Sequence, residues 1–332
     1  MSSPSFSRRP FLIAASAALA APAWAQSSAR LDTFTVALWS KPITEQMPLL
    51  AEEDKGFYRA QGLALQLLPG AGGGDALRNL LSGQADVAFT DPGSLFAALD
   101  KGERLRAVYD IYPRNVFNVV ALKKTGIRTP ADLRGRKVGV YSLASGTRQA
   151  LQVLLHSAGM TEADVTVVPT GLLNFAPLLQ GQVDATAATD TGLAIGRRRG
   201  LGEVEVIEAG SVLPVSSDLF VVREESYQQR KDLIRRFLRA YRDAAAWMIA
   251  APDEAAQLAV KRAIDGSDPA LNAEIVRLRN ASSVSPLTQE KGLGTPDVAS
   301  LQKAADVYRA LGLVQKRLDL AQVVAFDLLP GR

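Results

Sequence analysis

The sequence predicts an α/β fold, because strand-like and helix-like segments alternate over roughly the first two thirds of its 332 residues. A repeat supports this class: GQADVAFTD at residues 83–91 recurs as GQVDATAATD at residues 181–190. In both copies the glycine suits the end of a helix, the run after the first Asp suits a buried strand, and the final Thr-Asp suits the cap of the next helix. The two units indicate either two lobes of similar construction or two stretches of one larger sheet.

Apolar runs predict the strands, and apolar residues at helical spacing predict the helices. The third observation is a change after about residue 226, where the chain becomes mostly helical. Residues 70–74 are expected to form a loop, with Asp75 capping the helix that follows it. Further strands are expected at 34–38, 63–68, 105–109, 117–122, 137–141, 165–168, 204–207 and 219–222, and helices at 45–56, 92–101, 147–158, 230–250 and 301–311.

Residues 1–25 are expected to be an export signal. The run around Arg8 and Arg9 resembles a twin-arginine signal, an apolar stretch follows, and Ala23-Trp24-Ala25 fits a cleavage site. The stretch is too short to span a bilayer comfortably. We therefore expect a soluble, exported protein, periplasmic in a cell with two membranes, with either the folded-protein route or the general route open to it.

The composition excludes several classes of site. A net charge of +4, without a long basic stripe, argues against nucleic-acid binding. The absence of cysteine excludes disulfides, thiolate metal sites, cysteine nucleophiles and an N-terminal lipid anchor. The single histidine, His156, excludes a histidine-rich metal cluster and is expected to be an ordinary helix residue. No catalytic motif is recognised, so we expect no catalytic residues, no metal and no cofactor.

Several short motifs, in order along the mature chain, resemble the landmarks of ABC-transporter substrate-binding proteins of the SsuA/THI5-like (NMT1-like) family. They are residues 50–63, with Lys55-Gly56-Phe57-Tyr58 at their centre, and residues 82–86, 132–139, 181–185 and 252–255. The resemblance implies a two-lobed, type II periplasmic-binding-protein-like fold, each lobe a mostly parallel sheet flanked by helices, with a ligand cleft between the lobes. It places lobe I at 26–115 and 216–332 and lobe II at 116–215, with the helical tail packing back on lobe I.

The resemblance also implies a function. It predicts a monomeric, non-enzymatic protein that captures a small organic or oxyanionic nutrient by lobe closure and delivers it to ABC permease membrane subunits. Sulfonates, taurine, nitrate-like anions and thiamine-precursor pyrimidines remain open as ligands. The alternatives are a sensor partner that presents its ligand to a receptor, and a pyrimidine-precursor synthase; the synthases of this family carry a cysteine-rich motif that this chain lacks.

Ligand contacts are expected where strands end, because loops and helix N-termini converge at the carboxyl edge of a parallel sheet. The segment Ser145-Gly146-Thr147 is the sharpest candidate, since a helix start leaves N–H groups free for an anion, although ordinary capping would look the same. Trp39 could lie against a ligand or pack between the lobes, and Asp91 and Asp190 could cap helices or pair with a ligand amine. The complete set of candidates is Trp39, Gly73, Thr90, Asp91, Ser142, Ser145, Gly146, Thr147, Asn174 and Asp190.

Overall fold

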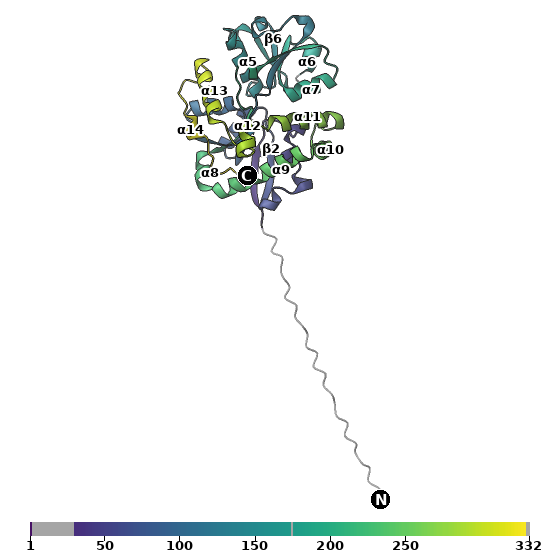
Figure 1. The fold of residues 1–332 in the computed structure, drawn as a ribbon, viewed down its shortest axis with the longest axis vertical. Helices are drawn as coiled ribbons and strands as arrows, with labels where there is room; N and C mark the ends of the chain where they lie inside the picture. The colour runs from purple at the N-terminus through teal and green to yellow at the C-terminus, as the bar shows by residue number, and fades with distance from the viewer. Residues whose placement is uncertain (2–29, 174, 330–332) are drawn as a thin grey trace. The chain divides into compact units, whose positions relative to one another are not determined.

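The computed structural model describes residue 1, residues 30–173 and residues 175–329. The predicted export signal beyond its first residue, the cleavage site after Ala25 and the candidate Asn174 lie outside the described residues. The body from Leu31 onward contains two separate five-stranded sheets (Figure 1). The repeat therefore marks two lobes and not two stretches of one sheet.

The first sheet, which together with its flanking helices we call lobe I, has the order β2-β1-β3-β10-β4. Strand β1 is parallel to β2 and β3, whereas β10 is antiparallel to β3 and β4. Its strands are β1 (Asp32–Ala37), β2 (Leu63–Leu68), β3 (Val87–Thr90), β4 (Leu105–Tyr112) and β10 (Asp218–Arg223).

The second sheet, with its helices lobe II, has the matching order β7-β6-β8-β5-β9. Strand β6 is parallel to β7 and β8, and β5 is antiparallel to β8 and β9. Both sheets are thus mixed. The chain crosses between the lobes twice, from β4 to β5 and from β9 to β10, and the antiparallel pairings in each sheet involve the strands next to these crossings. A helical crossover within one sheet makes successive strands parallel, whereas a strand that enters from the other lobe can run in either direction. Its strands are β5 (Phe117–Leu122), β6 (Lys137–Val140), β7 (Thr166–Pro169), β8 (Ala185–Thr189) and β9 (Val204–Glu208).

The repeated phrase has the same structure in both lobes. Gly83 and Gly181 have φ of 80° and 69°, the left-handed conformation that ends a helix and favours glycine. The strands that follow, β3 and β8, occupy the central position of their sheets.

Most helices begin and end close to their predicted bounds, with two exceptions. In place of the single helix expected at 45–56, the structure has three short helical segments: a turn at residues 44–46, α1 and α2. Gly56 ends the last of them as predicted, with φ of 68°. The helix expected to begin at Asp75 begins at Gly73, because the Asp75 carboxylate accepts from the Ala71 N–H (2.8 Å) inside the first turn. The helices up to residue 198 are α1 (Met47–Leu50), α2 (Glu52–Lys55), α3 (Gly73–Leu81), α4 (Pro92–Asp100), α5 (Gly146–Ser157), α6 (Ala176–Leu179) and α7 (Asp190–Arg198).

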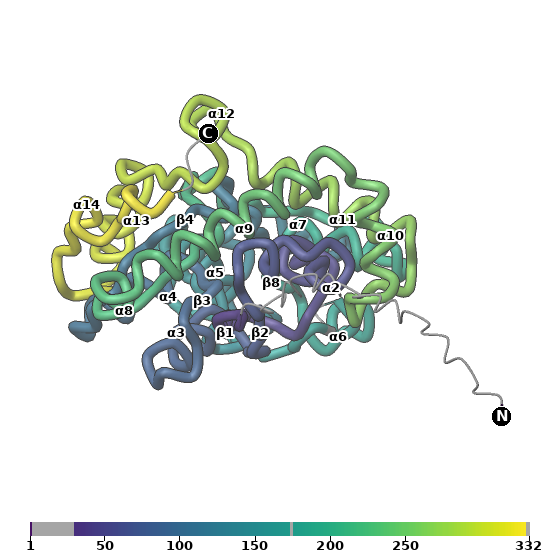
Figure 2. The backbone as a smooth tube through the Cα atoms, turned by 90° about the horizontal axis from the view of Figure 1, so that it is seen from below, coloured from purple at the N-terminus to yellow at the C-terminus, as the bar shows by residue number. Residues whose placement is uncertain are grey.

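The helical tail packs against the first sheet and its helices (Figure 2). Phe237 of α9 stacks on Phe34 of β1 with ring centroids 4.4 Å apart, and Tyr308 of α13 meets Phe96 of α4 at 5.4 Å. None of the helices in the described part of the chain has the length and hydrophobicity of a membrane span. The tail consists of α8 (Glu224–Gln229), α9 (Lys231–Ala250), α10 (Pro252–Arg262), α11 (Pro269–Ser282), α12 (Pro286–Lys291), α13 (Val298–Ala310) and α14 (Leu320–Val323).

The two crossing segments are joined by hydrogen bonds. The Ser217 N–H donates to the Tyr112 carbonyl (2.9 Å), and the Val116 N–H donates to Ser217 Oγ (3.0 Å). Asn115 Nδ2 donates to the Leu213 carbonyl (2.9 Å). The crossings lie between β4 and β5 and between β9 and β10. A hinge motion between the lobes would therefore change the backbone angles of these hydrogen-bonded crossing residues.

Candidate functional site

A cavity of about 250 Å³ lies between the lobes, and we call it the interlobe cleft. Both lobes contribute to it: Trp39, Asp91 and Asp218 come from lobe I, and Phe117 and Thr147 from lobe II. The other side chains and backbone segments around it are Ile43, Glu45, Gly72, Gly73, Tyr141, Ser145, Gly146, Leu172, Phe175, Thr189, Thr191, Gly192, Ile195, Gly196, Arg199, Ile264, Asp265 and Arg279.

Aromatic rings form much of the wall. Trp39 follows β1 and meets Tyr141 of lobe II edge-on, with ring centroids 6.1 Å apart and planes at 90°. Phe117 and Phe175 add two further rings from lobe II. The indole Nε1 of Trp39 is buried and has no hydrogen-bond partner among the described residues. A buried donor without an acceptor is costly, so this N–H is a candidate contact for a bound molecule.

Three buried carboxyl groups line the cleft. Asp218, at the start of β10, makes no side-chain hydrogen bond or ion pair within the described chain, and burial raises its pKa well above the usual range. Burial raises the pKa of Asp91 to about 6, although the N–H and Oγ of Ser94 both donate to that carboxyl group at 2.8 Å. Burial also raises the pKa of Glu45, against the lowering effect of Arg279. The cleft therefore offers hydrogen-bonding carboxyl groups; of the two arginines in its lining, Arg279 is paired, whereas Arg199 is exposed and makes no ion pair within the described residues.

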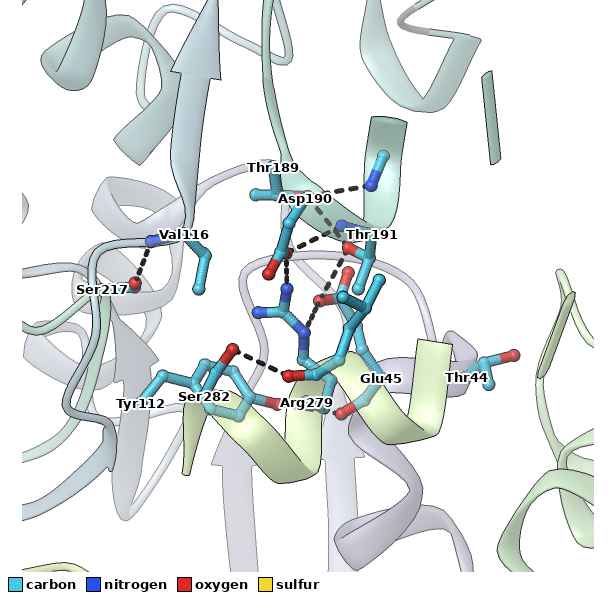
Figure 3. A network of polar contacts seen from close by, with 12 residues as sticks. Thr44, Glu45, Tyr112, Val116, Thr189, Asp190, Thr191, Ser217, Arg279 and Ser282 are labelled. Atoms are coloured by element: carbon cyan, nitrogen blue, oxygen red, sulfur yellow. Dashed lines mark hydrogen bonds and ion pairs between the residues drawn. The ribbon is translucent and has the colours of Figure 1, made fainter. Parts of the chain in front are cut away.

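Arg279 of α11 is the buried cation beside these acids, with 1% of its side chain exposed. Its Nε lies 3.4 Å from Glu45 Oε2, its Nη2 pairs with Asp190 Oδ1, and its guanidinium carbon lies 4.9 Å from the centre of the Tyr112 ring (Figure 3). Two carboxylates thus offset its charge before any ligand is considered.

Asp190 does not cap α7, contrary to one of the two predicted roles. Thr189 is the cap: its hydroxyl accepts from the Gly192 N–H (3.1 Å). The Asp190 carboxylate accepts from the Thr191 N–H (2.7 Å) and pairs with Arg279. In the other copy of the repeat, Asp91 caps α4 as predicted.

The helix start at Ser145-Gly146-Thr147 faces the cleft, but its hydroxyls are already engaged. Ser145 Oγ donates to the Ser142 carbonyl (2.7 Å), and Thr147 Oγ1 accepts from the Tyr141 N–H (3.0 Å). The Arg148 side chain, a possible extra charge here, pairs instead with Glu162. What remains for a ligand is the pair of backbone N–H groups of Gly146 and Thr147, which donate to no acceptor among the described residues.

The structure brings six of the predicted site residues together around the cleft: Trp39, Gly73, Asp91, Ser145, Gly146 and Thr147. Thr90 lies behind the wall, where its hydroxyl donates to the Gly73 carbonyl (2.9 Å). Ser142 bonds across the lobes to the Ala71 carbonyl, outside the lining. That any of these residues binds a ligand stays a prediction.

Sequence reasoning missed Glu45, Asp218, Arg279, Phe117 and Phe175 as lining residues. Asp218 and Phe117 open the two strands that follow the lobe crossings, so they reach the cleft through strand starts, whereas the prediction considered strand ends. A polar Ser-Ser-Asp directly before an apolar strand was the available signal for Asp218. Nothing in the local sequence distinguishes Arg279 from other helical arginines. Within the described residues, no group of His, Cys, Asp and Glu side chains could hold a metal ion.

Comparison with known proteins gives one family. A family model described as NMT1/THI5 like matches residues 43–255. The riboflavin-binding protein RibY of Chloroflexus aurantiacus is 27% identical over 96% of this chain and 91% of its own length. The 4-amino-5-hydroxymethyl-2-methylpyrimidine phosphate synthase THI5 of Saccharomyces cerevisiae is 22% identical over 68% of this chain and 69% of its own. The alkanesulfonate-binding protein SsuA of Xanthomonas axonopodis, solved with MOPS, has the same fold, with a TM-score of 0.72, 19% identity and coverage of 90% of this chain and 100% of that one.

Proposed function

Because the chain belongs to the NMT1/THI5-like family, we propose that it is the exported solute-binding protein of an ABC importer. It would work as a monomer in the periplasm after cleavage following Ala25, close its two lobes on a small organic solute and present that solute to the permease subunits. The two-lobed fold, the cleft between the lobes and the relative named a riboflavin-binding protein support this function. N-terminal sequencing of the protein from a periplasmic fraction should begin at Gln26.

The solute we propose is a planar nitrogen heterocycle that carries N–H or NH₂ donors. The observation that carries this choice is the pair of unpartnered polar groups in an aromatic cleft: Trp39 Nε1–H, which can only donate, and the Asp218 carboxyl group, which can accept. A heterocycle with adjacent ring nitrogen and amino groups would satisfy both, and its faces would pack on the rings of Tyr141 and Phe117.

The same geometry disfavours the oxyanions that the sequence left open. A sulfonate or nitrate would lie among Asp91, Asp218 and Glu45, and the buried cation beside these acids, Arg279, is already paired. Placing an anion beside buried acids costs free energy unless they are protonated. Within the described lining, the N–H groups of Gly146 and Thr147 and the exposed Arg199 are the features that would favour an anionic group.

Thermal shift with a ligand panel tests the proposal. The panel should include pyrimidines, flavins, taurine, alkanesulfonates and nitrate. A ligand at about 100 times its Kd stabilises the folded protein by about 2.7 kcal/mol, which moves the melting temperature measurably. We expect heterocycles to raise it and the oxyanions to leave it unchanged. A panel without any stabilising compound would count against a binding protein.

A synthase is the second candidate, because the yeast enzyme aligns with two thirds of this chain. The two functions differ in what becomes of the small molecule. A binding protein returns its ligand unchanged, whereas a synthase supplied with iron and pyridoxal phosphate would release a pyrimidine phosphate. Mass spectrometry of the small molecules after incubation separates the two, and we expect no new product.

A further inference from the structure

Helices α7 of lobe II and α11 of the tail pack against each other across the lobe boundary, and we call this contact the interlobe seam (Figure 1). Its middle is apolar: Ala194 of α7 is buried against Leu271 and Ile275 of α11. Since α11 belongs to the chain that returns to lobe I, the seam joins the two lobes at a point distinct from the crossing segments.

Each end of the seam carries an ion pair. At the start of α7, Asp190 pairs with Arg279, which is near the end of α11. At the other end of α7, Arg198 Nε lies 2.6 Å from Asp268 Oδ2, and Asp268 is the N-cap of α11. The helices therefore run antiparallel, and charges of opposite sign meet at both ends.

The two pairs differ in exposure, which decides how much each contributes. The Arg198 and Asp268 side chains are 56% and 29% exposed, so water and salt screen this pair. In the other pair the Asp190 side chain is 32% exposed, but the Arg279 side chain is 1% exposed, lies over the Tyr112 ring and is held on the lobe I side by Glu45 (Figure 3). If the lobes separated, Arg279 would keep its lobe I partners and lose Asp190, which is bound to lobe II through β8 and α7.

We propose that the interlobe seam is a closure latch: it holds the lobes together without ligand, and Arg279–Asp190 is its main polar contact. This inference rests on the proposed function, in that closing the lobes encloses a solute. Arg279 also lines the cleft, so the latch and the ligand site share one side chain. Arg279 is accordingly a positioning residue, which favours the closed state whose cleft walls the ligand contacts.

The latch can be tested on ligand-free protein, because the chain contains no cysteine to interfere with labelling. Spin labels attached through Gln180→Cys in lobe II and Lys261→Cys in α10, both exposed positions, report the distance between the lobes by pulsed electron spin resonance. In this background, Asp190→Asn removes the ion pair with the buried Arg279 and keeps the side-chain size, and Arg198→Gln removes the ion pair with Asp268. The matched control is Asp164→Asn, which removes a pair with Arg134 that lies wholly within lobe II.

We expect Asp190→Asn to raise the ratio of long to short interlobe distances about tenfold, the effect of losing one hydrogen bond to a charged group. Arg198→Gln should raise it less, and Asp164→Asn should leave it unchanged. Circular dichroism of each variant confirms that it is folded. Unchanged distances in Asp190→Asn and in the Asp190→Asn/Arg198→Gln double variant would overturn the latch. The distances are measured without ligand, so that result would not count against the proposed function. Conversely, if no ligand bound in the thermal-shift panel, the latch could still be tested by the same distance measurement.

Discussion

At the scale of single residues, buried carboxyl groups without full hydrogen bonding are the unusual feature of lobe I. Asp110 of β4 is 1% exposed; its Oδ2 accepts from Ser216 Oγ (2.6 Å), and its Oδ1 has no partner among the described residues. Burial raises its pKa to about 8, with a further contribution from Asp297. A raised pKa means that the folded state binds the proton more tightly than the unfolded state, so this contribution to stability is present at low pH and is lost as pH rises toward 8.

Asp110→Asn tests that linkage. Between pH 5 and pH 7 the wild-type protein should lose about 1.4 kcal/mol of unfolding free energy per pH unit through this one group, and the variant should not. Denaturant unfolding at a series of pH values measures the difference in slope between the two proteins. Asp306→Asn, at an exposed position, serves as the control. Parallel pH profiles for wild type and Asp110→Asn would show that Asp110 titrates normally.

Trp39 allows the hydrogen bond to be separated from the ring. Trp39→Phe keeps an aromatic wall and removes the unpartnered Nε1–H, so we expect about tenfold weaker binding of the heterocycle that the thermal-shift panel identifies. Trp247→Phe is the control, because the Trp247 indole donates to Glu254 far along the tail and does not line the cleft. Calorimetric titration measures the affinity of both variants. Equal affinity in wild type and Trp39→Phe would mean that the indole N–H does not contact the ligand.

At the scale of elements, the starts of α3 and α4 fit closely together beside the cleft. A Cβ atom added at Gly73 would lie 2.1 Å from Asp91 Oδ2 and 2.9 Å from the Asp91 backbone nitrogen. No side chain can be placed there without moving the cap of α4. The glycine is thus required by close packing, and the run of glycines at this position is part of the wall of the cleft.

Gly73→Ala should therefore destabilise the protein by about 1–3 kcal/mol, the usual cost of overpacking, and also weaken ligand binding. Gly202→Ala is the matched control, since nothing lies within 4 Å of its added Cβ atom and its φ is not positive. Thermal and denaturant unfolding measure the stability of both variants. A Gly73→Ala protein as stable as wild type would show that the α3 and α4 starts separate easily.

Most strands and helices could be predicted from the sequence, because apolar runs and helix-ending glycines lie within the elements that they indicate. The apolar runs at 63–68 and 117–122 gave β2 and β5 with the observed bounds, and Gly56 ended its helix in the expected left-handed conformation. The direction of β10 within its sheet could not be predicted, because it depends on where the chain crosses between lobes. For the same reason Asp218, at the start of that strand, was not expected in the cleft.

The role of Asp190 shows the limit at the level of side chains. Its position after a strand and before a helix indicated either a cap or a ligand contact, and local sequence cannot reveal a partner that is distant in the chain. Arg279, which supplies that partner, comes from a helix of the tail and meets Asp190 only because the tail folds back between the lobes. The part of the site that depends on such long-range contacts could not be predicted from the sequence alone.

At the scale of the whole molecule, the two lobes have the same strand arrangement and differ in charge at the cleft. Lobe I contributes the buried carboxyl groups of Glu45, Asp91 and Asp218, and lobe II contributes aromatic rings and a helix start. If the chain binds a flat heterocycle as we propose, closing one lobe on the other would place hydrogen-bonding groups at the edge of that ligand and rings against its faces. In our proposal the interlobe seam holds the lobes in this arrangement. The tail helix α11 and the lobe II helix α7 must then separate before a solute can bind or leave.

Calorimetric titration of wild type and Asp218→Ala with two probes, 4-amino-5-hydroxymethyl-2-methylpyrimidine and taurine, tests the central claim most directly. The wild-type protein should bind the pyrimidine and not taurine. Asp218→Ala should bind the pyrimidine at least about tenfold more weakly, yet melt no lower than wild type, because it removes a buried carboxyl group that has no protein partner. Tight binding of taurine, or an Asp218→Ala protein that binds the pyrimidine as wild type does, would contradict the account.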